Sequence, residues 1–392
     1  MRQIIKNNID RLAPEMIKVR HRIHSNPELA GEEVSTAKII TDVLRNFGYD
    51  SITTNIVGNG ISVMLDSGKA GKTIGIRAEL DALPILEVTN APYKSKIDGK
   101  MHACGHDGHI ATILTVAGTL IQSKEHFKGK IKFIFQPAEE TAGSGAIDMV
   151  NNGVLENPTV DAIFGFHGTH RYEVNKVATN IGCLMASHDV FKIKLNGNGG
   201  YISSLAAKSN PIEIASLIIQ CLKDIQNVTL YTEHIIVSVT KFDTVGTSGQ
   251  VPNEVMLEGS IRTVTRSTQM LIKQQIMNAV MELATQFNVM ATVDFKEKMP
   301  PVINTDKETM AVINAAKEVV EQADIINMNT IMAPEGFGSY LEKIPGCFFF
   351  MGNGLHRGSV HKGDYNFNDN VIPIAAEIMS IAVINYLNDQ AV

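Results

Sequence analysis

A strand, helix, strand order near the start of the chain restricts its fold more than any other feature. Two β-branched segments, Gly60–Asp66 and Thr73–Leu80, precede an apolar segment with helical spacing, Gly108–Ser123. A third β-branched segment, Lys130–Gln136, follows that helix. A helix between two strands in this order forms a crossover connection, which joins parallel strands of one buried sheet. The sequence therefore predicts an α/β fold with a mainly parallel sheet.

Further elements are expected on both sides of this crossover. Residues Arg11–Phe47 have a helical pattern with an interruption at Asn26–Glu28, and Pro27 fits the first turn of a second helix. A helix at Ser144–Gly153 and a strand at Val160–Phe166 extend the same domain. The first part of the chain therefore supplies most of one α/β domain.

A different order of elements begins near Ser187. Strands and helices then follow in the order β-α-β-β-α-β, at Val190–Leu195, Pro211–Gln226, His234–Phe242, Glu254–Thr263, Thr268–Phe287 and Met290–Lys296. This is the order of ferredoxin-like α+β folds. The chain then returns to alternation, with helices at Asp306–Gln322 and Asn370–Leu387 around an apolar strand, Cys347–Met351. We therefore expect a discontinuous α/β domain of residues 1–186 plus 300–392, interrupted by an α+β domain of residues 187–299.

The composition excludes several classes of protein. The chain has 35 Lys and Arg against 41 Asp and Glu, a formal net charge of -6, so no overall positive field attracts nucleic acid or anionic lipid. Its apolar stretches are too short for a transmembrane helix, which needs about 20 residues, and the N-terminus lacks the apolar run of a secretory signal. Four cysteines without an export signal indicate a reducing compartment. We therefore expect a cytoplasmic protein that acts on small molecules or peptides.

The segment Met101–His109 contains the densest group of potential ligands in the chain, with three histidines, a cysteine and an aspartate. It lies directly before a predicted helix, and open α/β sheets hold ligands in such loops. Cys104 and His106, two residues apart, can bind one zinc-like ion or flank a pair of ions. The alternative is a polar loop that caps the helix, but capping does not require Cys beside His. The segment therefore favours a metal site.

Further carboxylates and imidazoles follow the next two strands. Glu139 and Glu140 come directly after one strand, so one carboxylate can bind a metal ion while the other takes a proton from water. His167 ends the next strand. Each signal is weak alone, because Glu-Glu pairs are common on surfaces and a lone histidine is more often structural. Late in the chain either His356 or His361 could complete the site, and spacing alone does not choose between them.

The remaining histidines and the glycine-rich segments do not indicate another site. His21, His24, His188 and His234 lie in helical or strand patterns without convergent partners, and we expect them on the surface or in the core. The segment Gly197–Gly200 does not match the dinucleotide-binding fingerprint. The chain also lacks a phosphate-binding loop and the Gly-x-Ser-x-Gly elbow of serine hydrolases. Chemistry based on a metal ion is therefore the leading hypothesis.

The ordered motifs resemble those of the co-catalytic metallopeptidase family that contains aminoacylases, hippurate hydrolases and the amidohydrolases of auxin–amino acid conjugates. The resemblance covers nearly the whole chain. It rests on Arg22–Leu29, Arg77–Ile85, His102–His109, Phe135–Glu140, Phe164–His167, Gly259–Thr263, Ala333–Phe337 and His361–Asp369. The implied fold is a zinc-peptidase-like catalytic domain with a ferredoxin-like lid and dimerisation domain. This agrees with the two domains expected from the element order.

The resemblance also implies a role for individual residues. Glu139 would be the general base, and Asp81 would fix a ligating imidazole. His361 rather than His356 would complete the site, because its spacing to the residues that follow is that of the family motif. The ligands of two divalent ions, zinc or manganese, would then be Cys104, His106, Glu140, His167 and His361. The expected assembly is a homodimer, or a dimer of dimers, formed through the lid domain.

Four positions depart from the family pattern. Tyr201 replaces a His that reaches the partner subunit's substrate and steadies the developing oxyanion, and Gly249 replaces an Asn. Gly336 replaces the Asp of a Glu-Asp-Phe motif, and Glu79 replaces the first acid of the Arg-Ala-Asp motif. The metal ligands are thus intact while the substrate side is changed. The residues that we expect on the substrate side are Tyr201, Arg262 and Glu335.

The sequence therefore predicts a metal-dependent amidohydrolase that cleaves the amide bond of N-acyl amino acids or short peptides. The alternative is a metal-binding relative with lost or altered activity, because Tyr201 and Gly249 replace family substrate-binding residues. A purely structural zinc site fits less well. Structural sites have closed shells of Cys and His, whereas here a spare carboxylate, Glu139, stands beside the expected ligands.

Overall fold

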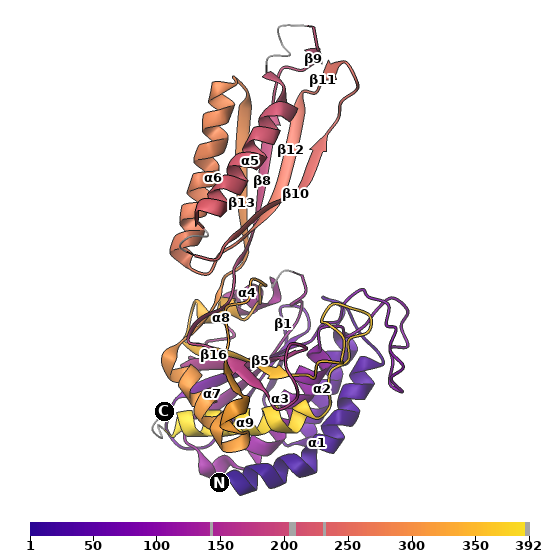
Figure 1. Ribbon diagram of the computed structural model, residues 1–392. Helices are drawn as coiled ribbons and strands as arrows, with labels where there is room; N and C mark the ends of the chain where they lie inside the picture. Colours follow the sequence, from indigo (N-terminus) through magenta and orange to yellow (C-terminus); the bar gives the residue numbers. More distant parts are fainter. Residues whose placement is uncertain (142–143, 204–208, 230–232, 389–392) are drawn as a thin grey trace. The chain divides into compact units, whose positions relative to one another are not determined.

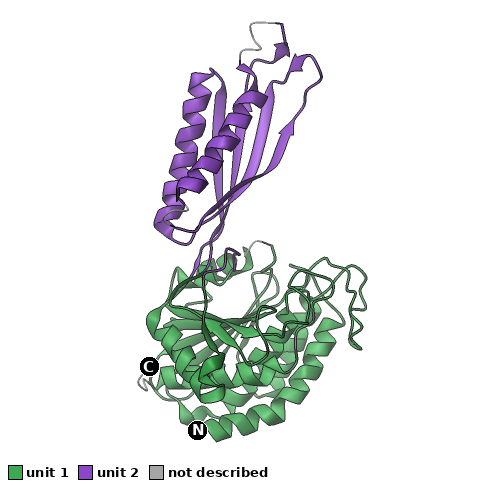
Figure 2. Ribbon diagram, viewed as in Figure 1, with its two compact units in different colours: residues 1–184, 303–329, 336–392 green, residues 185–302, 330–335 purple. Residues whose placement is uncertain are grey.

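The structure is a computed structural model that describes residues 1–141, 144–203, 209–229 and 233–388. The chain divides into two compact units, which Figure 2 draws in different colours. Unit 1 contains residues 1–184, 303–329 and 336–392, and unit 2 contains residues 185–302 and 330–335. Unit 1 is therefore discontinuous in the sequence.

Unit 1 is built on an eight-stranded sheet with the strand order β1-β2-β4-β3-β5-β16-β6-β15. Its strands are β1 (Ile52–Ile56), β2 (Gly60–Asp66), β3 (Thr73–Glu79), β4 (Lys130–Gln136), β5 (Ala162–Thr169), β6 (Val177–Thr179), β15 (Ile325–Asn327) and β16 (Gly346–Gly352). β3 pairs in parallel with β4 and β5, β5 with β16, and β6 with β15. The other neighbouring strands are antiparallel. The predicted α/β class with a mainly parallel sheet is confirmed.

Helix α3 (His106–Ile121) makes the predicted crossover between β3 and β4. Its residues are buried from His106 to Leu120, because it packs against α1 (Arg2–His24) and α9 (Val371–Leu387) as well as against the sheet (Figure 1). A Cβ atom at Gly118 would lie 3.0 Å from the Leu12 side chain of α1. A small residue at this position therefore lets the two helices approach closely.

The other helices of unit 1 are shorter than α1, α3 and α9. They are α2 (Val34–Asn46), α4 (Ser144–Asn151), α7 (Asp306–Val319) and α8 (Gly338–Leu341), with 3-10 turns at Lys124–His126 and Gln322–Asp324. α7 packs on α9 (Figure 1). Among the described residues, no helix is both long enough and apolar enough to span a membrane.

The expectation that Pro27 lies in the first turn of the second helix is wrong. α2 begins at Val34, seven positions later, and residues 26–33 form turns and a loop. The reason is the side chain of Glu28, whose carboxylate accepts the backbone N–H groups of Ser35 at 3.0 Å and Thr36 at 2.8 Å. These amides of the first helical turn have no partner within the helix, so a carboxylate placed there stabilises the later start.

Unit 2 has the predicted β-α-β-β-α-β order, from β8 (His188–Asn196) and α5 (Pro211–Thr229) to α6 (Arg266–Gln286) and β13 (Met290–Met299). Between these pairs lie β10 (Ile236–Thr244) and β12 (Glu254–Arg262). The antiparallel sheet has the order β10-β12-β8-β13, which is the ferredoxin-like arrangement. One core joins inward residues of β8, β10 and β12 to those of α5 and α6. The predicted α+β fold is confirmed. The remaining short strands of the chain's described residues are β7 (Gly182–Met185), β9 (Gly200–Tyr201), β11 (Gln250–Val251) and β14 (Val302–Asn304).

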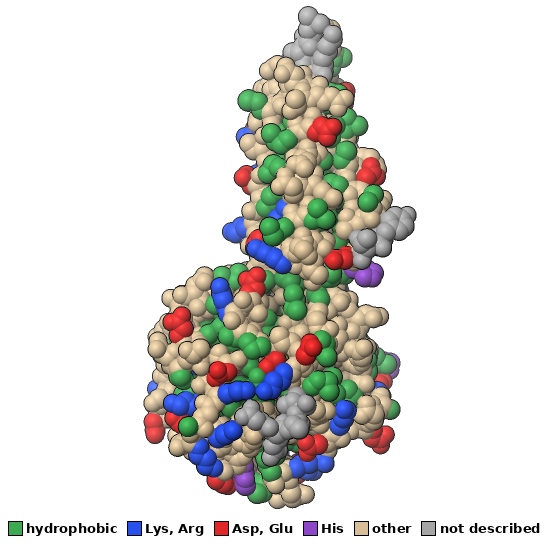
Figure 3. All heavy atoms as spheres, turned by 90° about the vertical axis from the view of Figure 1, so that its left-hand side faces the viewer, with side chains coloured by type: hydrophobic (Ala, Val, Ile, Leu, Met, Phe, Trp, Pro, Cys, Tyr) green, Lys and Arg blue, Asp and Glu red, His purple; other side chains and the backbone are tan. Residues whose placement is uncertain are grey.

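Charged side chains of both signs are scattered among hydrophobic and uncharged groups on the face of unit 1 that Figure 3 shows. Lys and Arg side chains lie among Asp and Glu side chains there, so neighbouring charges largely offset one another. This mixed surface agrees with the formal net charge of -6.

Candidate metal centre

The parallel strands β3, β4 and β5 end at the same edge of the sheet and deliver the predicted residues to it. Asp81 follows β3, Glu139 and Glu140 follow β4, and His167 lies near the end of β5. The loop before α3 and its first residue add Cys104 and His106, and the segment before α9 adds His361. Ligand sites of open α/β sheets form at such carboxyl ends.

The side chains of the five predicted ligands converge on one another. The Cys104 Sγ and His167 Nε2 atoms are 3.2 Å apart, and the His361 Nε2 and Glu140 Oε1 atoms are 3.3 Å apart. Among the described residues, three groups that each contain at least two of the predicted ligands have their ligand atoms within 4.8 Å of one another: Cys104, His106 and His167; Cys104, Glu140 and His361; and His106, Glu139 and Glu140. Because these groups share members, they form one continuous centre. A four-coordinate ion with one position open to water needs three protein ligands. The five electron-pair donors here, from four segments of the chain, are more than one such ion needs.

Backbone contacts fix which ring nitrogen of two histidines carries the proton. The His106 Nδ1 atom lies 2.9 Å from the carbonyl oxygen of Asp81, and the His167 Nδ1 atom lies 2.7 Å from that of Gly168. A carbonyl oxygen can only accept, so each Nδ1 must donate. In the neutral ring, each Nε2 atom is therefore left with its electron pair. The lone pairs of two imidazoles, a thiol and carboxylates therefore face one another. Such a set of electron-pair donors is typical of a site that binds a cation, and these residues fit a divalent metal ion.

The protonation of Cys104 depends on such a cation. Burial, followed by the nearby carboxylate of Glu140, raises the pKa of the thiol well above its usual value. A metal ion reverses this preference, because it binds the thiolate and displaces the proton. The site is therefore suited to a cation and not to a free thiolate.

Two hydrogen bonds hold the carboxylates in place. The Asp81 Oδ2 atom accepts the backbone N–H of Glu140 at 2.9 Å, while its Oδ1 atom lies 3.3 Å from His106 Nδ1. The Glu139 Oε1 atom accepts the backbone N–H of Gly336 at 3.0 Å. Asp81 thus contacts the segments of two predicted ligands, His106 and Glu140, and Glu139 is held beside the predicted ligands.

Unusual backbone geometry occurs at three positions around the centre. Gly105, between Cys104 and His106, has a φ of 95°, and a Cβ atom there would lie 2.6 Å from the Tyr365 hydroxyl. Ala138 and His361 have φ values of 53° and 63°, in a region that favours glycine. Such strain persists only where surrounding contacts hold it, and it is concentrated at functional sites. Here the carbonyl of Ala103 accepts the His361 N–H at 2.8 Å, and a Glu33 carboxylate oxygen accepts the Ala138 N–H at 2.9 Å.

The other predicted residues lie outside this group. His356 is exposed and belongs to none of the converging groups among the described residues. Tyr201, Arg262 and Glu335 belong to unit 2. Tyr201 is 64 % exposed in β9, pairs with Gln250 of β11, and is therefore next to Gly249, so two departures from the family pattern are neighbours. Arg262 ends β12, and together with burial it lowers the pKa of His188 to about 4.

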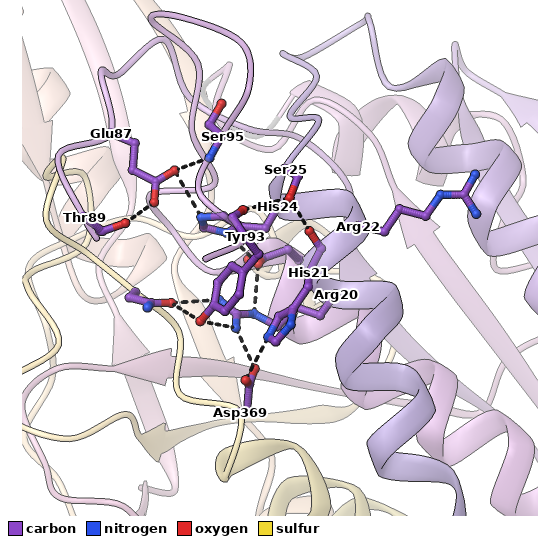
Figure 4. Close-up of polar contacts among 12 residues, drawn as sticks. Arg20, His21, Arg22, His24, Ser25, Glu87, Thr89, Tyr93, Ser95 and Asp369 are labelled. Carbon is purple, nitrogen blue, oxygen red and sulfur yellow. Dashed lines mark hydrogen bonds and ion pairs between the residues drawn. The ribbon is translucent and has the colours of Figure 1, made fainter. Parts of the chain in front are cut away.

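The expectation that His21 and His24 have no convergent partners is wrong. The His24 Nδ1 atom lies 2.9 Å from Asp107 Oδ2, and its Nε2 atom lies 3.3 Å from Glu87 Oε2. His21 Nε2 lies 2.9 Å from Asp369 Oδ2, and its ring stacks on Tyr93. Figure 4 shows these side chains of α1 pointing into one polar cluster.

Arg20 lies at the centre of this cluster, although it was not among the predicted residues. It is fully buried, and it forms an ion pair with Asp107 at 2.9 Å. It forms a second ion pair with Asp369 at 2.6 Å (Figure 4). Burial opposes the charge of Asp107, but Arg20 and His24 outweigh it and hold the pKa of that carboxyl far below its usual range. Because Asp107 follows the predicted ligand His106, the cluster anchors the start of α3. The spacing of four residues between Arg20 and His24, which places both on one helix face, was the available signal.

We expect the contribution of His24 to stability to decrease above neutral pH. Burial opposes the charged ring, but Asp107 and Glu87 outweigh it and raise the pKa of His24 from 6.5 to about 9. Because the pKa is higher in the folded chain, the charged ring stabilises the folded chain fully below pH 6.5. This stabilisation is lost as the pH rises through about 9. At about 1.4 kcal/mol per pKa unit, the charged ring contributes roughly 2–4 kcal/mol. The midpoint of thermal unfolding of His24→Gln should therefore lie well below that of the unsubstituted protein at pH 6.

The control is His234→Gln, since His234 is exposed in unit 2. The difference in unfolding midpoint caused by His24→Gln should shrink between pH 7 and pH 10, whereas His234→Gln should change little at any pH. A His24→Gln difference that stays constant over this range would contradict the assignment of a charged ring.

Comparison with known proteins identifies the class to which this site belongs. Residues 75–385 match the peptidase family M20/M25/M40. The chain is 32 % identical to hippurate hydrolase of Campylobacter jejuni over 378 residues, covering 96 % of this chain and 97 % of that protein. It is 35 % identical to N-acetyl-L-cysteine deacetylase of Bacillus subtilis over 347 residues, covering 88 % and 82 %. The chain belongs to the peptidase family M20/M25/M40, and the predicted resemblance is confirmed.

Two solved structures have the same fold. A putative aminohydrolase from methicillin-resistant Staphylococcus aureus gives a TM-score of 0.93 at 32 % identity, covering 99 % of this chain and 100 % of the other. The YXEP protein of Bacillus subtilis, a dinuclear metal-binding peptidase of the M20 family, gives 0.86 at 30 % identity, covering 96 % and 99 %. The protein is therefore a metal-dependent hydrolase of the M20 peptidase and amidohydrolase family.

Proposed function

We propose that the protein hydrolyses the amide bond of small N-acyl amino acids or short peptides at a centre of two divalent ions. The observation that carries this proposal is the convergence of electron-pair donors, most of them buried, at the ends of β3, β4 and β5, with the carboxylate of Glu139 beside them. The proposed ligands are Cys104, His106, Glu140, His167 and His361. The names of the relatives, hippurate hydrolase and N-acetyl-L-cysteine deacetylase, support substrates of this size and class.

In this mechanism the residues of the chain bind the metal ions, hold one another in position and transfer protons. The two ions would polarise the scissile carbonyl and lower the pKa of the attacking water. Glu139 takes a proton from that water and returns it to the leaving amine. The N–H of Gly336 holds one Glu139 oxygen, and Asp81 keeps the His106 ring in the orientation that presents Nε2. Asp81, His106 and Glu139 are buried, so the charges among them interact more strongly than they would in bulk water.

A second function, metal binding with lost or altered turnover, is favoured by Tyr201 and Gly249. The two positions are neighbours at the β9–β11 pair, so one small region of unit 2 carries both changes. Removal of an oxyanion donor typically costs 10²–10³ in turnover. An assay of the metal-loaded protein against a panel of N-acyl amino acids and dipeptides distinguishes the two functions, because only the hydrolase releases free amine.

We propose zinc or manganese as the metal and the cytoplasm as the location. The thiol and imidazole donors suit zinc, whereas the carboxylate donors also suit manganese. Four free cysteines are compatible with a reducing compartment.

Two ions per chain should be found by elemental analysis of the purified protein. Cys104→Ala should lower both metal content and activity, because the variant lacks the thiol that lies 3.2 Å from His167. Cys347→Ala is the matched control, since Cys347 is also buried, in β16, and belongs to no ligand group among the described residues. A single ion per chain that is retained by Cys104→Ala would contradict the proposed centre.

Glu139 and Glu140 should respond differently to the same substitution. Glu139→Gln keeps the shape of the side chain but removes the basic oxygen, so metal content should stay near normal while turnover falls by about 10²–10⁴. Glu140→Gln should weaken metal binding itself. Metal analysis and steady-state kinetics on both variants test this. Loss of metal in Glu139→Gln alone would exchange the two roles, and full turnover in both variants would exclude the mechanism.

We further propose that unit 2 is a lid that pairs with its copy in a second subunit, giving a homodimer. Its four-stranded sheet has two edge strands, β10 and β13, whose outer backbone groups can extend the sheet across a two-fold axis. Light scattering at micromolar concentration should give about twice the 42.7 kDa chain mass. A monomer under these conditions would contradict this assembly.

A further inference from the structure

The amide of Gly168 has an unusual hydrogen-bond partner. β5 continues to Thr169, but its pairing with β3 ends where Arg77 faces Gly165. Beyond that point the Gly168 N–H donates instead to the His109 Nε2 atom, at 3.0 Å. A side chain of α3 therefore accepts the Gly168 N–H beyond the end of the β3–β5 pairing.

Three buried residues in turn hold the His109 ring. Its Nδ1 atom lies 2.9 Å from Glu79 Oε2, and the other oxygen of Glu79 accepts a hydrogen bond from Arg77. The Arg77 Nε atom donates to Gln136 Oε1 at 2.8 Å. All four side chains are at most 1 % exposed. Glu79 and Gln136 are the last residues of β3 and β4, so the chain of contacts runs across three neighbouring strand ends.

This hydrogen bonding excludes His109 as a ligand, although Glu79, His106 and His109 have ligand atoms within 4.8 Å of one another. A backbone N–H can only donate, so His109 Nε2 must be the acceptor. Its Nδ1 then carries the proton and donates to Glu79. Both ring nitrogens are used, and neither retains an electron pair for a metal ion.

The held peptide group belongs to the predicted ligand His167. The Gly168 nitrogen is part of the peptide that joins it to His167, and the Gly168 carbonyl accepts the His167 Nδ1 proton at 2.7 Å. The rings of His109 and His167 are also in contact, with centroids 4.5 Å apart. A shift of the Gly168 amide would therefore move both the backbone and the ring orientation of His167.

We propose that His109 and Glu79 are positioning residues that fix His167 Nε2 toward the metal centre by holding the Gly168 amide. The ligand role of His167 rests on the proposed function, whereas the hold on the Gly168 amide rests on hydrogen bonds within the chain. Groups that orient a ligand in this way typically contribute 10–100-fold to metal affinity.

Two substitutions of His109 distinguish its proposed hydrogen bond to the Gly168 amide from a role in which the ring only fills space in the core. A Gln side chain can place its amide oxygen near the position of Nε2 and so still accept the Gly168 N–H. An Asn side chain can place its amide nitrogen near the position of Nδ1, so it retains the contact with Glu79 but loses the contact with Gly168. We expect His109→Asn to bind Co²⁺ about 10–100-fold more weakly, with a changed charge-transfer absorption from the Cys104 thiolate, and His109→Gln to stay within about 3-fold of the unsubstituted protein.

Hydrogen exchange of the Gly168 amide in the metal-free protein gives a readout independent of the metal. Exchange should be much faster in His109→Asn than in His109→Gln or the unsubstituted protein. Thr115→Val is the control for disturbing buried α3, because the Thr115 hydroxyl donates to the Ala111 carbonyl within the same helix. This variant should keep both Co²⁺ affinity and Gly168 protection.

Equal Co²⁺ affinity and equal Gly168 protection in the Asn and Gln variants would overturn the proposal. If neither variant folds, Glu79→Gln provides the test. The Arg77 guanidinium can only donate, so it takes the single Gln oxygen, and the Gln NH2 group then faces His109 Nδ1 in place of an acceptor. Weaker Co²⁺ binding and faster Gly168 exchange in Glu79→Gln support the proposal, and unchanged values overturn it. Failure of the unsubstituted protein to bind two Co²⁺ ions would instead count against the proposed function, while Gly168 exchange would still test the hold on the amide.

Discussion

The candidate centre depends on the common end of three parallel strands. Because β3, β4 and β5 run in the same direction, the residues after each strand meet at one edge of the sheet. The crossover helix α3 must begin at that edge, so the Cys104 and His106 segment arrives at the same place. Buried lone pairs that face one another destabilise a chain unless a cation is bound. The topology therefore creates a site that a divalent ion completes.

Two similar groups of buried charges flank the segment that carries these ligands. On one side Arg20, Asp107 and His24 connect α1 to the start of α3. On the other side Arg77, Glu79 and His109 connect the end of β3 to α3 and β5. In each group an arginine keeps a buried carboxylate ionised, and that carboxylate binds an imidazole. We infer that both groups hold α3 in the position in which Cys104 and His106 face the other ligands.

The sequence was sufficient to predict those features that depend on local pattern. The βαβ crossover and the β-α-β-β-α-β insertion follow from hydrophobic period and element order, and both are observed. The dense segment before α3 identified Cys104 and His106 because unusual residues stand side by side in it. Three further predicted ligands lie with them, although no single pattern required this.

Features that depend on distant partners could not be predicted. Asp107 lies 83 residues from His24, and Gly168 lies 59 residues from His109, so neither contact leaves a local signal. The start of α2 was misplaced because Pro27 has a strong local preference, whereas the observed start depends on where the Glu28 carboxylate reaches. These contacts are determined by tertiary packing, which overrides propensity.

Anomalous X-ray diffraction from crystals of the metal-loaded protein tests the central claim most directly. Data collected on both sides of the absorption edge of the added metal should show two strong peaks per chain. Both peaks should lie among the side chains of Cys104, His106, Glu140, His167 and His361, within about 2.0–2.3 Å of ligand atoms in the case of zinc. Peaks located elsewhere, or a centre without metal at full loading, would contradict the account.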